Sequence, residues 1–164
     1  MQLRTLLLAS LCAIACNNSI AGLPPASDPA TETFAPSLGI DISQMSRTAN
    51  GVYFQTVRVG TGEEIKATSD TIVVTYQGYL KDGTLIDQQS NFHVVAGVVP
   101  GFREGITGMR EGGERKIVIP SNLGYGSQTI RNTDLSIKIP RQSTLVFDVT
   151  AIHVHNPADT TSTS

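Results

Sequence analysis

The sequence predicts an α+β protein in which an antiparallel β-sheet wraps around one short α-helix. Runs of β-branched and aromatic residues recur along the chain, an Asp-Gly pair separates two such runs, and one stretch spaces its apolar residues as a helix does. A short helix of low propensity needs a sheet to pack against, so the helix and the strands are expected to share one core.

Strands are expected over residues 52–59, 71–80, 117–119 and 145–154, where β-branched and aromatic residues are frequent. The sequence Lys81-Asp82-Gly83-Thr84 follows the second of these runs. Because Asp-Gly suits turn positions that require positive φ, it predicts a hairpin there. The last strand also carries His153 and His155 on one face. With no third ligand nearby, exposed histidines at the end of a strand are favoured over a metal site.

The helix is expected over residues 102–109, where Phe102, Ile106 and Met109 fall on one side. Two glycines inside this stretch, Gly105 and Gly108, lower its intrinsic helix propensity. The helix is therefore expected to depend on its contacts with the sheet.

The 164-residue chain has room for one domain with a modest core. We expect a signal peptide over 1–21, a mostly irregular linker over 22–50, the folded domain over 51–155 and a disordered polar tail over 156–164. The net charge of -2 is spread without a basic stripe, so nucleic acid is not expected as a partner.

The N-terminus carries Arg4 and then about ten apolar residues, as a secretory signal peptide does. Ser19-Ile20-Ala21 predicts cleavage before Gly22 and a periplasmic or secreted protein. The alternative is an outer-membrane lipoprotein that is lipidated on Cys16. Because both cysteines lie in this leader, the domain is not expected to use disulfides.

Four segments in fixed order, VTYQGYLKDGTLID, VVPGF, VIPSNLGYG and TLVFDVTAI, resemble FKBP-type peptidyl-prolyl cis-trans isomerases. The resemblance covers roughly residues 51–154. It implies an FKBP-like fold and isomerisation of Xaa-Pro bonds in unfolded or nascent exported polypeptides, with macrolides as inhibitors. It implies no cofactor and no metal.

By this resemblance Tyr125 donates its hydroxyl to the substrate carbonyl, and Asp87, the family's buried acidic residue, is held by Tyr76. The other residues that the resemblance places in the pocket are Ile86, Phe92, Val98, Val99, Phe102 and Phe147. Residue chemistry agrees, because a twisted prolyl bond has less charge separation than a planar one and is favoured in a dry apolar pocket with one placed donor.

Simpler interpretations of these residues remain open. Phe102, Val99 and Phe147 suit an ordinary core, Asp87 suits the end of a surface strand, and Tyr125 between two glycines suits local loop packing. The joint match in fixed order favours the pocket.

The sequence departs from the family at several places. Phe102 stands where most active members have Trp, and Ile86 stands where a Phe precedes the acidic residue. The segment 87–92 is short and lacks a supporting Arg, and 127–138 is long, polar and free of glycine. These departures motivate a second hypothesis, a proline-binding module or holdase chaperone with little turnover.

Two further expectations concern selectivity and assembly. Val98, Val99 and Ile86, without an evident charged selector, predict a preference for an apolar residue before proline. By the same resemblance, those exported relatives that dimerise do so through a long helical N-terminal extension, and residues 22–50 are too short and too interrupted by proline to supply one. A monomer is therefore expected.

Overall fold

The computed structural model describes residues 28–67, 69, 71–94 and 97–157. The predicted signal peptide, both of its cleavage sites, the start of the linker and the chain after Pro157 lie outside the described residues. No described helix is long and apolar enough to cross a membrane.

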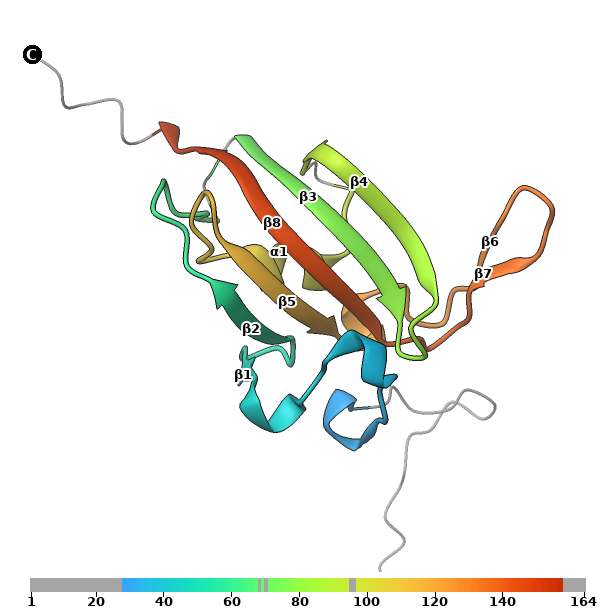
Figure 1. Ribbon diagram of the computed structural model, residues 1–164. Coiled ribbons are helices and arrows are strands. Elements are labelled where there is room, and N and C mark those ends of the chain that lie inside the picture. The colour runs from blue at the N-terminus through green and yellow to red at the C-terminus, as the bar shows by residue number, and fades with distance from the viewer. Residues whose placement is uncertain (1–27, 68, 70, 95–96, 158–164) are drawn as a thin grey trace, which may run out of the picture.

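The strands form a six-stranded antiparallel sheet that curves over one short α-helix, which confirms the predicted fold class (Figure 1). The sheet order is β1-β2-β5-β8-β3-β4, and β6 and β7 form a separate hairpin. The strand bounds are β1 Ser46–Arg47, β2 Tyr53–Arg58, β3 Thr71–Leu80, β4 Leu85–His93, β5 Glu114–Ile119, β6 Ile130–Arg131, β7 Ile137–Ile139 and β8 Leu145–His155.

The predicted strands correspond to β2, β3, β5 and β8, and the Asp-Gly turn joins β3 to β4 with Gly83 at φ 89°. The hairpin of β6 and β7, most of which lies in the long polar segment 127–138, was not predicted. Its residues alternate too weakly between apolar and polar to predict strands.

The helix α1, Pro100–Ile106, ends three residues earlier than predicted. Pro100 occupies its first turn, where a missing N–H costs nothing. Thr107 already has extended backbone and Gly108 has φ 79°, so the chain leaves the helix before Met109. Met109 still reaches the core, where it is 3% exposed.

Two glycines let α1 lie directly on β5. A Cβ added to Gly101 would stand 2.3 Å from Ile119 Cγ2, and one added to Gly105 would stand 2.5 Å from Ile117 Cγ2. From the sequence, Gly105 was expected only to weaken the helix. The structure shows that its missing side chain permits the close contact of helix and strand.

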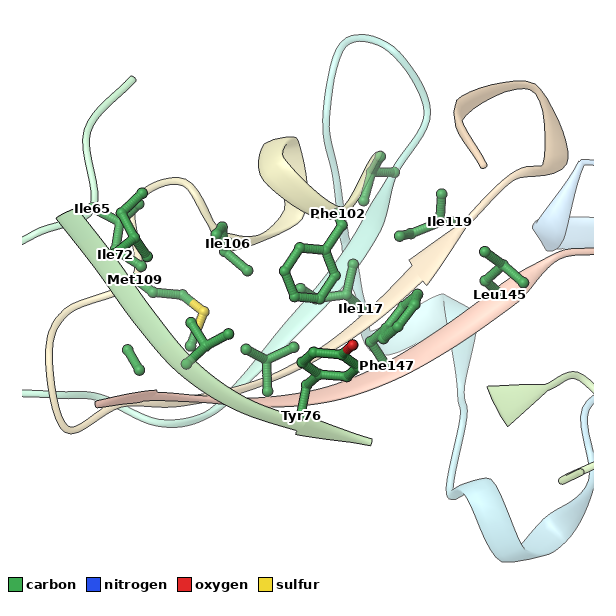
Figure 2. Close-up of a cluster of buried hydrophobic side chains, with 14 of the residues drawn as sticks. Ile65, Ile72, Tyr76, Phe102, Ile106, Met109, Ile117, Ile119, Leu145 and Phe147 are labelled. Carbon is green, nitrogen blue, oxygen red and sulfur yellow. The ribbon is translucent and has the colours of Figure 1, made fainter. Parts of the chain in front are cut away.

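The main core fills the space between α1 and the inner face of the sheet (Figure 2). Ile65 and Ile72 lie at one end of it, Ile119 and Leu145 lie at the other, and three aromatic rings lie between them. The rings belong to Tyr76, Phe102 and Phe147. This aromatic part of the core lies next to the pocket described below.

The segment predicted as a linker instead covers part of the sheet's outer face. Its described part contains the 3-10 helices η1 Pro29–Thr31, η2 Pro36–Leu38 and η3 Ile42–Gln44. Leu38, 5% exposed, packs with Tyr53, Val118 and Val146 in a second core cluster. The Pro-rich sequence of this segment lacks helical or strand periodicity. Its packing therefore depends on the apolar outer face that the strands present.

Polar contacts also fasten this segment to the sheet. The Ala35 N–H donates to the Lys81 carbonyl at 2.8 Å, and Lys81 Nζ lies 3.2 Å from Glu32 Oε2. The Thr144 hydroxyl donates to the other Glu32 oxygen at 2.6 Å. The folded unit therefore includes residues before 51, where the sequence had placed its start.

The C-terminal boundary also differs from the predicted one. Asn156, predicted as the first residue of the tail, is 2% exposed. Its side-chain amide donates to Glu63 Oε2 at 3.1 Å and to the Glu64 carbonyl at 3.0 Å. A buried and hydrogen-bonded side chain belongs to the domain.

Replacing Gly105 with Ala is expected to lower the free energy of unfolding by about 1–2 kcal/mol. Alanine favours a helix by about 1 kcal/mol, but the 2.5 Å approach to Ile117 places the cost of crowding in the upper part of its usual range, at about 2–3 kcal/mol. Urea denaturation measures the difference. Gly97→Ala is the control, because nothing lies within 4 Å of a Cβ there. Equal or greater stability of Gly105→Ala would mean that α1 and β5 have room to separate.

Replacing Leu38 with Ala is expected to lower the free energy of unfolding by about 2–4 kcal/mol, the usual cost of emptying a buried leucine site. Leu135→Ala is the matched control, because Leu135 is 73% exposed and surface substitutions usually change stability by less than about 0.5 kcal/mol. If both variants unfolded at the same urea concentration as the parent protein, residues 28–45 would not contribute to the fold.

Candidate functional site

A pocket of about 290 Å³ opens on the inner side of the sheet, between β4, the start of α1 and the β6–β7 hairpin. All nine predicted site residues line it. They are Tyr76, Ile86, Asp87, Phe92, Val98, Val99, Phe102, Tyr125 and Phe147. Residues far apart in the sequence therefore meet in one place.

The aromatic residues pack edge to face around Tyr76. The Tyr76 ring lies 5.4 Å from Phe92, 5.6 Å from Phe102 and 5.9 Å from Phe147, measured between centroids, at steep interplanar angles. The Phe102 and Phe147 centroids are 5.1 Å apart. Figure 2 shows Tyr76, Phe102 and Phe147 converging from β3, α1 and β8. Such T-shaped pairs are favourable for aromatic quadrupoles and fix the ring orientations.

Phe147 has room to lie over β3 because it faces a glycine. Gly78 is its cross-strand partner, and a Cβ there would stand 2.7 Å from Phe147 Cε1. Gly78 also pairs with Asp87 of β4 on its other side. The absent side chain at Gly78 thus determines where one wall of the pocket stands.

Asp87 accepts a hydrogen bond of 2.8 Å from the Tyr76 hydroxyl to its Oδ2 atom. The predicted partnership of these two residues is therefore present. Asp87 itself is exposed, whereas the sequence analysis expected a buried acid. The difference arises because β4 is the edge strand of the sheet, so solvent reaches the carboxylate from the open side.

The electrostatics of the pocket keep two tyrosines protonated. Burial, and then the hydrogen bond and charge of Asp87, raise the pKa of Tyr76 well above its usual value. Burial and the Asp87 charge also raise the pKa of Tyr125. Both phenols therefore remain hydrogen-bond donors at physiological pH.

Tyr125 lies in the loop after the 3-10 helix η4, Ser121–Leu123, and is 36% exposed. The loop is held by a 2.8 Å bond from the Gly126 N–H to the Ser121 carbonyl. Among the described residues, no partner accepts from the Tyr125 hydroxyl. The hydroxyl is therefore placed at the pocket with its proton available for a ligand.

Five lining residues were not predicted. They are Gln89, Gly97, Ile130, Lys138 and Ile139. The last three belong to the β6–β7 hairpin, whose position against the pocket depends on long-range packing. The one available signal was the unusual length of 127–138. Lys138 also gives the pocket a positively charged residue, which was not predicted from the sequence.

A larger hollow of about 600 Å³ lies on the outer face of the sheet, away from α1. Tyr76 is its only aromatic lining residue, and two of its charged groups pair with each other, Lys116 Nζ and Asp148 Oδ1 at 2.5 Å. The smaller pocket, with its aromatic walls, is the better candidate for binding an apolar ring.

No group of three potential metal ligands occurs among the described residues. His153 Nδ1 lies 3.2 Å from Glu111 Oε2. This contact gives His153 a carboxylate partner at the end of β8.

Comparisons with known proteins agree with this geometry. The family model for FKBP-type peptidyl-prolyl cis-trans isomerases matches residues 62–152. The chain is 38% identical to the FKBP-type peptidyl-prolyl cis-trans isomerase FkpA of Escherichia coli strain K12 over 129 residues, 75% of this chain and 43% of that protein. It is 33% identical over 121 residues to FkpA of Buchnera aphidicola, 71% of this chain and 46% of that protein.

A solved structure shows the same architecture. The crystal structure of AtFKBP13 matches with a TM-score of 0.60 and 29% identity, covering 66% of this chain and 97% of that chain. By contrast, this chain spans less than half the length of the two FkpA proteins that it matches.

Replacing Tyr76 with Phe is expected to reduce the loss of stability at alkaline pH. A folded-state pKa raised above the unfolded value of about 10 stabilises the fold fully below that pH, and this contribution is lost as the pH rises through about 10 toward the folded pKa. Urea denaturation between about pH 9 and about pH 11 should show a steeper fall for the parent protein, by at most about 1.4 kcal/mol per pH unit. Identical pH profiles would contradict a protonated Tyr76 in the fold.

Proposed function

This chain belongs to the family of FKBP-type peptidyl-prolyl cis-trans isomerases, and we propose that its pocket binds proline residues and accelerates rotation of the preceding peptide bond. The observation that supports this most strongly is the aromatic pocket itself. Edge-to-face rings form its floor and walls, and hydroxyl donors stand at its side.

The proposed reaction breaks no covalent bond. Rotation about the peptide C–N bond loses amide resonance, with a barrier of about 18–20 kcal/mol. In the twisted state the nitrogen and the carbonyl are less charge-separated than in the planar amide, so an apolar site favours the transition state over the ground state. Phe102, 3% exposed, would form the floor beneath the prolyl ring.

Tyr125 would donate its hydroxyl to the substrate carbonyl. A donor that is fixed before the substrate arrives needs little reorganisation as the carbonyl rotates. The Asp87 charge supports this role because it disfavours ionisation of Tyr125. Asp87 also orients Tyr76 through their hydrogen bond and so positions the ring at the centre of the aromatic cluster.

Ile86, Val98 and Val99 would surround the residue before proline. Ile86 is 7% exposed and the two valines are half-buried, so they offer apolar surface that is already in place. This surface supports turnover of peptides with an apolar residue before proline.

A second candidate function is a binding module or holdase chaperone with little turnover. Leu135, 73% exposed, and Ile137, 56% exposed, place apolar surface on the hairpin beside the pocket. Such surface favours retention of unfolded segments. NMR exchange on an Xaa-Pro peptide separates the two functions, because an isomerase broadens the cis and trans lines by exchange and a holdase only shifts them.

We further propose that the protein is exported and acts on proline-containing polypeptides in the periplasm or outside the cell. The apolar stretch after Arg4 supports export, by cleavage before Gly22 or by lipidation of Cys16. A monomeric state is proposed because residues 28–50 form single-turn helices packed on the sheet, and no long helix occurs in this described part. Macrolides that occupy the same pocket are proposed as inhibitors.

Two variants test the roles of the polar groups. Tyr125→Phe is expected to slow isomerisation about three- to tenfold, the loss of one hydrogen bond worth roughly 0.5–1.5 kcal/mol. Asp87→Asn is expected to lower turnover by a similar factor of about three to ten, because it removes the charge that acts on both tyrosines. NMR exchange measures the rates, and melting curves should stay near those of the parent protein.

Asp82→Asn is the control for Asp87→Asn. It removes the same charge from the same hairpin at a turn residue outside the pocket, and its side chain can still accept from the Thr84 N–H. Parent-level turnover in folded Asp87→Asn would remove Asp87 from the proposed site. Equal losses in both Asp variants would indicate a general charge effect.

A further inference from the structure

We propose that Lys138 selects substrates, favouring polypeptides with a carboxylate side chain next to the proline. The proposal rests on the proposed function, because it concerns the same pocket. It names a charged selector where the sequence analysis expected none.

The hairpin holds Lys138 at the wall of the pocket. Lys138 lines the pocket and is half-buried on β7, between the exposed Ile137 and the buried Ile139. Ile139 is 3% exposed and pairs with Ile130 of β6. Because Ile139 and its partner Ile130 both line the pocket, the strand that carries Lys138 lies against the site.

Hydrogen bonds at both ends of the hairpin limit its movement. At the tip, Arg131 Nη1 donates to the Leu135 carbonyl at 2.8 Å, and the Asn132 N–H donates to the Ser136 carbonyl at 2.9 Å. At the base, the Gln142 N–H donates to the Gly126 carbonyl at 2.7 Å. The backbone that carries Lys138 is therefore held in place before a ligand arrives, which lowers the cost of ordering this side chain on binding.

Lys138 is the positively charged residue of the pocket lining, and it forms no ion pair with another described residue. Its charged companion in the lining is Asp87, which accepts from Tyr76. Elsewhere in the described chain several cations have carboxylate partners, including Lys81 with Glu32 and Lys116 with Asp148. No ion pair of Lys138 occurs among the described residues. Its ammonium group therefore remains available to a ligand.

Asp87 and Lys138 give the pocket two walls of opposite charge. Asp87 comes from β4 and Lys138 from β7. Asp87 repels a substrate carboxylate and Lys138 attracts it. Both charges therefore favour a peptide orientation in which the carboxylate lies near Lys138 and away from Asp87. The aromatic floor between them contributes no charge preference.

The expected effect is small because the ammonium is partly solvated. Exposed ion pairs are weak, which corresponds to a preference of about two- to fivefold. The correct comparison is therefore between isosteric peptides with Glu and Gln, since a comparison with Leu would mix charge with apolar burial.

The test measures NMR exchange catalysed by the full chain on peptide pairs that carry Glu or Gln directly before or directly after proline. We expect the parent protein to favour Glu by about two- to fivefold at one of these positions. Lys138→Gln should abolish the preference and Lys138→Glu should reverse it. Salt at about 1 M should abolish it in the parent protein, because screening weakens exposed pairs.

Arg141→Gln is the matched control. Arg141 is exposed, lies outside the pocket lining and carries the same charge three residues away. It should keep the Glu preference of the parent protein. Equal rates for Glu and Gln at both positions, or equal losses in Arg141→Gln and Lys138→Gln, would overturn the proposal.

Failure of the proposed function gives a different result. If no peptide showed catalysed exchange, isomerisation would be excluded, and the same peptide pairs would be titrated for binding by chemical shift. Tighter binding of the Glu peptide that disappears in Lys138→Gln would still support the selector. Equal affinities for Glu and Gln peptides would overturn it.

Discussion

The close contact between α1 and β5 is the constraint on which the pocket depends. A seven-residue helix does not hold its shape alone, so its position comes from packing. Gly101 and Gly105 allow that packing, and Arg115 completes it by donating from Nη1 to the carbonyls of Gly105 and Thr107, each at 2.8 Å. The Arg115 guanidinium also stacks 4.5 Å from the centre of the Phe54 ring. The position of the floor residue Phe102 therefore depends on contacts that neighbouring residues of its own helix make with β5.

Packing on the outer face of the sheet also supports the strands that form the pocket. Leu145 and Phe147 of β8 point toward α1, and Val146 between them points outward, where it would meet water without Leu38. The N-terminal segment buries this outer side and is fastened at Lys81, in the turn that leads into β4. A segment with no group in the pocket thus supports the strands that form two of its walls.

The sequence was informative where local pattern determines structure. β-Branched runs predicted the central strands, and motifs in fixed order predicted nine residues that the structure places around one pocket. It was uninformative where position depends on distant partners. The exposure of Asp87 follows from the edge position of β4, and the packing of Leu38 follows from strands that come later in the chain. Lys138 belongs to a polar segment whose contact with the pocket has no local signature.

The residues of the pocket differ in their exposure to water, and this difference separates the roles proposed for them. At the buried floor a charged ligand group would lose its hydration without a partner, so Phe102 and Phe147 can accept only an apolar ring. At the rim, Asp87 and Lys138 keep contact with water, so a ligand charge retains most of its hydration there. Rim charges can therefore change preference by small factors without preventing other substrates from binding. If the pocket binds proline as proposed, this division of roles would let it accept many prolines and rank them by the residues next to them.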